Sequence, residues 1–123
     1  MKPVARVLPR ATRMNRTEAR YAVILEVRRR AGEVAEYHFE AVTLKIADDT
    51  RYTPDFLVVL ADGQCELHEV KGGYVWEDAR LKFQVAVEEW GHLFGFVWAQ
   101  WSGGEWSMRR YPRRSPPSGA AER

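Results

Sequence analysis

The sequence predicts a single α/β domain in which helices flank a mixed central sheet. Three observations predict it: an amphipathic helix pattern from about residue 15, a hairpin of two apolar strands around residue 62, and a second amphipathic pattern followed by another apolar strand. The expected order is helix, three strands, helix, strand (αβββαβ). Such an order packs as an α/β sandwich, with one helix on each face or both helices at one edge.

The composition is that of one globular domain. The chain has 123 residues, of which 46% are hydrophobic and 12% aromatic. Its longest apolar run, residues 93–99, is far shorter than the roughly 18 residues of a membrane span, and the basic start has no apolar segment of a secretory signal. Cys65 is the only cysteine, which excludes an internal disulfide and a cysteine zinc site. We therefore expect a cytoplasmic protein with no membrane partner.

Positive charge is concentrated at the two ends. Residues 1–16 carry five bases and no acid, and residues 109–123 carry five bases and one acid, whereas residues 17–108 carry nine bases and sixteen acids. Basic ends on an acidic body are typical of a protein that binds a phosphate backbone and has a metal site. The alternative is that the arginines only keep the chain soluble.

Composition also divides the chain into three parts. Residues 1–14 have two prolines and no periodicity, so they are expected to form a basic N-terminal arm. Residues 15–111 are expected to form the domain. Residues 112–123, PRRSPPSGAAER, have the composition of a disordered basic tail.

The first helix has a defined start and end. Asn15 is a plausible N-cap, and Glu18 three residues later completes a capping box. Tyr21 and Leu25 continue the face that Glu18 begins. Gly32 follows the last helical turn and ends the helix.

The remaining elements are read from periodicity. Residues 33–40 are ambiguous and partly extended, and residues 41–46 alternate and are expected to form the first strand of the sheet. Residues 77–91 predict the second helix, which is a suitable crossover between parallel strands. Residues 93–99 are expected to form the next strand, and residues 105–110 an edge strand. The aromatic residues expected in the core are Trp90, Phe94, Phe96 and Trp98. The histidines lack metal-ligand spacing and are expected to be structural: His38, His68 and His92.

The central hairpin joins the strands expected over residues 52–60 and 64–71 through the turn at residues 61–63. Both strands are apolar on much of both faces, so we expect both faces to be covered. A two-residue loop would place Asp55 opposite Val70. A three-residue loop, in which Gly63 takes a positive φ, places Asp55 opposite Glu69 instead.

The three-residue register is the one we adopt, because it gathers charge on one face. Asp55, Glu69 and Lys71 then point the same way, since residues two apart on a strand share a face. In the two-residue register the two acids would point to opposite faces. Two carboxylates and one ammonium among apolar neighbours have no packing purpose, and they predict a functional site.

The site has the chemistry of metal-assisted phosphodiester hydrolysis. Paired carboxylates at a strand edge offer the oxygen ligands that Mg²⁺ prefers, together with water and phosphate oxygens. Lys71 could orient or deprotonate the attacking water, or act as a fixed positive charge beside the phosphorus. Gly72 and Gly73 would allow a sugar-phosphate chain to approach the backbone closely.

These residues resemble the motif of the PD-(D/E)xK nuclease superfamily. Pro54-Asp55, then thirteen residues, then Glu69-Val70-Lys71 matches that motif, and the order of elements over about residues 15–99 is similar. The chain is most similar to small phage-type endonucleases and Holliday-junction resolvases. The resemblance implies a restriction-endonuclease-like core and a bacterial or phage-infected host cell.

The resemblance also implies roles for individual residues. Asp55, Glu69 and the Val70 carbonyl would bind Mg²⁺, for which Mn²⁺ would substitute, and Lys71 would be the catalytic lysine. Glu18 would be a further catalytic acid and metal ligand from the first helix. The alternative is that Glu18 is only the acid of the capping box.

DNA contacts are expected around this site and the basic N-terminal arm. Tyr74 and Trp76 would meet sugars or bases, the alternative being that they are lid or core aromatics. Lys82 would contact DNA from the second helix, or is an ordinary surface lysine. The expected DNA-binding residues are Arg13, Arg16, Arg20, Gly72, Gly73, Tyr74, Trp76 and Lys82.

The predicted function is a Mg²⁺-dependent endodeoxyribonuclease, selective for branched DNA because a chain this small has few residues left to read sequence. Cutting two strands needs two sites, so a homodimer is expected. One alternative is a DNA-binding module on a nuclease scaffold that has lost its chemistry. Another is a subunit that cuts only within a recombination or transposition complex.

Overall fold

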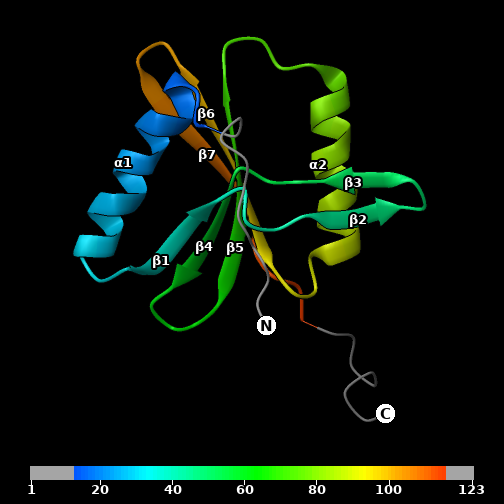
Figure 1. The fold of residues 1–123 in the computed structure, drawn as a ribbon, viewed down its shortest axis with the longest axis horizontal. Coiled ribbons are helices and arrows are strands. Elements are labelled where there is room, and N and C mark those ends of the chain that lie inside the picture. Colours follow the sequence, from blue (N-terminus) through cyan, green and yellow to red (C-terminus); the bar gives the residue numbers. More distant parts are fainter. Residues whose placement is uncertain (1–12, 116–123) are drawn as a thin grey trace.

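A computed structural model describes residues 13–115 as a mixed α/β domain with a five-stranded sheet and two helices (Figure 1). The helices and strands, in chain order, are α1 (Arg16–Arg30), β1 (Val34–Phe39), β2 (Leu44–Ala47), β3 (Thr50–Tyr52), β4 (Phe56–Leu60), β5 (Cys65–Gly72), α2 (Glu77–Trp90), β6 (Gly95–Ser102) and β7 (Glu105–Tyr111).

The main sheet is mixed, with strand order β1-β4-β5-β6-β7. β5 and β6 are parallel, and the other neighbouring strands are antiparallel. Helix α2 connects β5 to β6, so it is the crossover that two parallel neighbours require. β2 and β3 form a separate two-stranded sheet.

Helix α1 covers one face of the main sheet. Its buried Tyr21 and Leu25 pack against Phe56, Val58 and other apolar side chains of that face. Tyr21 also lies within hydrogen-bonding distance of the buried His68, with 2.7 Å between its hydroxyl oxygen and Nδ1. His68 is therefore a satisfied histidine of the core.

Helix α2 and the β2–β3 hairpin cover the opposite face, where the hairpin lies across the helix (Figure 1). Phe83 of α2 packs against Phe96 and Trp98 of β6 in edge-to-face arrangements. Leu44 and Tyr52 of the hairpin join the same cluster. The fold is therefore a sandwich with one helix on each face of the sheet.

The central hairpin has the predicted three-residue register. Phe56 pairs with His68, and the Leu60 N–H donates to the Gln64 carbonyl at 2.8 Å. Gly63 takes a φ of +89°, the left-handed conformation that this turn demands and that glycine adopts without strain. Asp55 and Glu69 therefore lie on one face, as the sequence predicts.

Two strand predictions were wrong. The first strand of the main sheet is β1 (Val34–Phe39), not residues 41–46, and the strand expected over 52–60 is interrupted at residues 53–55. Glu40 turns the chain with a φ of +50°, after which β2 pairs with β3. The apolar side chains of β2 alternate because they bury in the cluster between α2 and the main sheet, although β2 pairs with β3 and with no strand of the main sheet.

Residues 112–115, the first part of the expected disordered tail, lie within the described residues. Arg114 donates through Nη1 to the Val87 carbonyl and through Nη2 to the Glu88 carbonyl, both at 2.9 Å, and so closes the C-terminal end of α2. Free carbonyls at a helix end favour such a cation, so Arg114 holds this part of the expected tail against α2. The rest of the predicted tail, 116–123, and residues 1–12 of the predicted arm lie outside the described residues.

Within residues 13–115, no helix has the length and apolar character needed to cross a membrane.

Candidate metal centre and nucleic-acid interface

Asp55 and Glu69 lie side by side on the face of the sheet that α2 covers. Asp55 is the last residue before β4, and the register places it opposite Glu69 of β5. Both carboxylates are largely removed from solvent, because Asp55 is only 8% exposed and Glu69 only 7%. Burying two like charges together is costly unless a cation or donors compensate.

The Asp55 carboxyl shows this cost directly. Burial, and then the nearby Glu69 carboxylate, raises the pKa of Asp55 to about 8. The backbone N–H of Val70, which donates to Asp55 Oδ2 at 2.7 Å, and the charge of Lys71 oppose the rise without cancelling it. Asp55 therefore keeps its proton at neutral pH unless a cation compensates its charge.

Glu69 has a partner on each oxygen. Tyr52 of β3 donates its hydroxyl proton to Oε1, and Lys71 Nζ lies 3.0 Å from Oε2. Lys71 shares the face of Glu69, as predicted, and its side chain is 27% exposed, so it reaches both the acid and solvent. Burial, and then the nearby carboxylates, raise the pKa of Tyr52, which keeps its proton on the hydroxyl.

Two residues at this site were not predicted from the sequence. Tyr52 was expected in the same strand as Asp55, and only the separate β2–β3 hairpin brings its hydroxyl to Glu69. Glu40 lies near enough to Glu18 and Glu69 that burial and those two charges raise its pKa. Its backbone N–H donates to the Asp55 carbonyl at 2.8 Å, which ties the β1–β2 corner to the site. No local motif marks either residue.

Glu18 forms the predicted capping box. Its N–H donates to Asn15 Oδ1 at 2.7 Å, and its Oε1 accepts from the Asn15 N–H at 2.8 Å. Glu18 is nevertheless close enough that its charge contributes to the raised pKa of Asp55 and of Glu40. The structure thus gives Glu18 its helix-capping role and places it at the border of the acidic site.

The donor set fits a hard divalent cation. The N–H and C=O of a strand residue face the same side, so the Val70 carbonyl faces the side on which its N–H meets Asp55. Two carboxylates and one carbonyl are oxygen ligands of the kind that Mg²⁺ takes together with waters. Among residues 13–115, no three His, Cys, Asp or Glu side chains are grouped closely enough to hold a metal by themselves.

The end of β5 approaches the start of α1. A Cβ at Gly72 would lie only 3.0 Å from Thr17 Oγ1, so glycine is what permits this contact. Gly72 pairs with Trp101 of β6, over whose ring the Arg20 guanidinium lies at 4.4 Å. Arg20 is therefore held at the same end of the sheet as the strand that carries Glu69 and Lys71.

The other predicted contacts are distributed around this end. Gly73 follows β5 with a φ of +71°. Arg16 opens α1 and Arg13 precedes it, and both are exposed. Their guanidinium groups are therefore free to meet solvent, but neither belongs to the carboxylate cluster.

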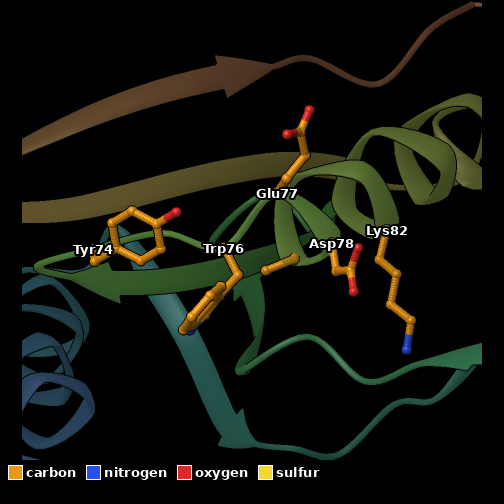
Figure 2. Close-up of a pocket in the computed structure, with 6 residues that line it drawn as sticks. Tyr74, Trp76, Glu77, Asp78 and Lys82 are labelled. Carbon is orange, nitrogen blue, oxygen red and sulfur yellow. The ribbon is translucent and has the colours of Figure 1, made fainter.

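Tyr74 and Trp76 form an open cavity with the first turns of α2 (Figure 2). The cavity has a volume of about 590 Å³, and the two rings meet edge to face with centroids 4.9 Å apart. Tyr74 is 75% exposed and Trp76 70% exposed, so neither is a core aromatic. Lys82 also lines this cavity.

Comparison with known proteins adds little to this geometry. No protein-family model matches the chain, and no curated protein matches it. Among solved structures, the crystal structure of a protein called SSO0001 resembles it at 13% sequence identity and a TM-score of 0.46. The resemblance covers 85% of this chain and 53% of that protein, so the chain spans about half of its length.

Proposed function

We propose that the protein is a metal-dependent endodeoxyribonuclease of the PD-(D/E)xK superfamily, with Asp55, Glu69 and Lys71 at its active site. One observation carries the proposal: two buried carboxylates, one directly before β4 and one on β5, share a face with a lysine that reaches solvent. The arrangement joins the ligands of a divalent cation to a partly exposed cationic side chain at one position.

A purely structural role explains the carboxylate pair poorly. Buried ion pairs stabilise a fold only when each charge is well compensated, and here one lysine faces two acids. A divalent cation between Asp55 and Glu69 would remove the repulsion that raises the pKa of Asp55. Metal binding would therefore explain why two mutually repelling carboxylates are buried together.

The order of elements supports the same superfamily. Without the β2–β3 hairpin and the edge strand β7, the chain runs α1, β1, β4, β5, α2, β6. This is the αβββαβ order of the restriction-endonuclease-like core, with Asp55 directly before its second strand and Glu69 on its third. The domain is small, as in phage-type endonucleases and Holliday-junction resolvases, and we therefore propose branched DNA as the substrate.

Each residue of the site has a separate proposed role in hydrolysis. Asp55, Glu69 and the Val70 carbonyl would hold Mg²⁺ or Mn²⁺, with Glu18 and Glu40 beside them. The bound cation would polarise the scissile phosphate and make a bound water more acidic. Tyr52 fixes one oxygen of Glu69, which leaves the other oxygen to Lys71 in the metal-free protein.

Lys71 has two possible tasks that follow from its position. Its Nζ can donate to an attacking water and orient it toward the phosphorus, or lie as a positive charge beside the phosphate oxygens. Either task requires that Nζ leave Glu69 Oε2 when the carboxylate binds metal. The partial exposure of Lys71 permits this movement.

DNA would approach over the end of the sheet where β5 stops. Arg20 over Trp101, the exposed Arg16 and the glycines 72–73 border this end and offer phosphate contacts at close range. Two cuts in opposite strands would require two such sites, so we propose a homodimer.

Cleavage of labelled DNA tests the function. A four-way junction, a linear duplex and a single strand are incubated with the protein in Mg²⁺ or in EDTA, beside the Glu69→Gln variant. We expect Mg²⁺-dependent cleavage of the junction that the variant lacks. Binding to DNA without cleavage of any of the three would instead favour a binding module or a subunit that cuts only within a recombination or transposition complex.

A further inference from the structure

We propose that the cavity formed by Tyr74, Trp76 and the first turns of α2 binds one unpaired nucleobase of the DNA substrate. The inference rests on the proposed nuclease function and deepens it, because it names the feature of branched or single-stranded DNA that the protein recognises. Its volume of about 590 Å³ lies within the roughly 300–1,000 Å³ of small-ligand sites.

The aromatic rings offer the surface that a base requires. Tyr74 and Trp76 expose 75% and 70% of their area, although large aromatic residues are ordinarily buried where nothing binds them. Because the rings are perpendicular, a base stacked on one of them meets the edge of the other. Stacking on aromatic faces is how proteins bind unpaired bases without regard to sequence.

The charged residues of the cavity favour a base over a phosphate. In Figure 2, Asp78 and Lys82 point to the same side of α2, whereas Glu77 points away from both. Among residues 13–115, neither Asp78 nor Lys82 forms an ion pair, so both are available to a ligand. The carboxylate repels a phosphate but accepts from the amino groups of a base, and the ammonium donates to base carbonyls.

The position of the cavity relates it to cleavage. Tyr74 follows Lys71 by three residues, and the intervening glycines 72–73 carry no side chain that would obstruct a strand. A strand whose phosphate meets Lys71 would therefore bring a neighbouring nucleotide to the aromatic pair. Only an unpaired nucleotide can enter, since a base within a duplex is stacked and paired.

Binding of two matched oligonucleotides tests the proposal. One is a short fluorescent oligodeoxythymidylate, and the other has the same length and charge but abasic sites in place of the bases. Anisotropy is measured in EDTA, where no cleavage occurs. We expect Trp76→Ala to weaken binding of the base-containing strand roughly 5- to 150-fold and to leave the abasic strand unchanged.

Matched variants make the result interpretable. Tyr74→Ala should behave as Trp76→Ala does, and Leu81→Ala, which removes a 56% exposed side chain of α2 that does not line the cavity, should bind both strands as the wild type does. Both substituted aromatics are exposed, so the variants are expected to fold.

Three outcomes would overturn the proposal. Equal loss of affinity for both strands would show that Trp76 contacts the backbone, and equal binding of both strands by the wild type would show that no base is recognised. Self-association that Trp76→Ala abolishes would assign the cavity to a second copy of the chain. Metal-dependent cleavage of the four-way junction by the wild type would survive each of these outcomes, so it separates failure of the base site from failure of the nuclease function.

Discussion

The ionisation of Asp55 makes the stability of the folded protein depend on pH. Its pKa rises from 3.8 to about 8 on folding, so the folded protein binds the proton more tightly than the unfolded chain does. The stability that this proton contributes is complete below about pH 4 and is lost as the pH rises through about 8. In EDTA, Asp55→Asn should therefore melt several degrees higher than the wild type at about pH 8 and equally at about pH 4.

Added metal supplies the control for this prediction. Asparagine keeps an acceptor for the Val70 N–H but has no charge, so Mg²⁺ should raise the melting temperature of the wild type and not that of Asp55→Asn. A variant that melts below the wild type at every pH, or that Mg²⁺ stabilises equally, contradicts the role given to Asp55.

Tyr52 is predicted to orient Glu69. Tyr52→Phe removes a buried hydrogen bond to a carboxylate, which should lower the free energy of unfolding by roughly 1–3 kcal/mol. It should also weaken Mn²⁺ binding roughly 10- to 100-fold, because the carboxylate loses a group that fixes it. Denaturant unfolding and calorimetric titration measure the two effects.

Tyr37→Phe is the matched control for this substitution. Tyr37 likewise donates its hydroxyl to a glutamate, Glu26, at 2.9 Å, but on the helix α1 side of the sheet, away from the carboxylate pair. Its loss should leave Mn²⁺ binding unchanged. Equal Mn²⁺ affinity in wild type and Tyr52→Phe would remove the positioning role of Tyr52.

The sequence predicts the residues at the centre of the site but not those around them. Spacing and loop length suffice to place Asp55, Glu69 and Lys71 on one face, because strand geometry repeats every two residues. Tyr52 reaches the site through the β2–β3 hairpin, which buries against α2, and Glu40 reaches it through a corner with positive φ. Tertiary packing of that kind leaves no periodic signal in the sequence.

At the scale of elements, the contact between α1 and β5 depends on the absence of a side chain. Gly72→Ala would bring a methyl group to 3.0 Å from Thr17 Oγ1 and 3.2 Å from its Cγ2, so the Thr17 side chain, or the start of α1 with it, must give way slightly. We expect a loss of roughly 1–3 kcal/mol in the free energy of unfolding. Thr17→Ala should cost little alone and restore most of that loss in the double variant, as denaturant unfolding would show.

If instead the effects of the two substitutions simply add, the close approach is not what requires glycine at this position.

The two wrong strand predictions also arise from contacts between elements. β1 alternates weakly and was ambiguous in the sequence, whereas β2 alternates clearly but buries against α2. Hydrophobic periodicity reports that a face is covered and does not report which element covers it.

At the scale of the whole molecule, the basic ends predict how DNA binding depends on salt. Residues 1–12 hold Lys2, Arg6 and Arg10 and no acid. If these residues touch phosphates, deleting them should lower the slope of log affinity against log salt by roughly 2–3. Fluorescence anisotropy of labelled duplex across a salt series measures the slope.

The opposite end offers a control with no change of charge. Deleting residues 116–123 removes one base and one acid, Arg123 and Glu122, and keeps the Arg114 contacts that close α2. This deletion should leave the slope unchanged. An unaltered slope in the N-terminal deletion would show that the bases of that end do not contact phosphates and serve only solubility.

Calorimetric titration of the metal-free protein with Mn²⁺ tests most directly whether Asp55 and Glu69 form a divalent-metal centre. The wild type should bind Mn²⁺, Asp55→Asn and Glu69→Gln should lose this binding, and Lys71→Met should keep it while losing DNA cleavage by roughly 100-fold or more. Absence of binding to the wild type, or binding that survives both carboxylate substitutions, would contradict the metal centre and the nuclease proposal built on it.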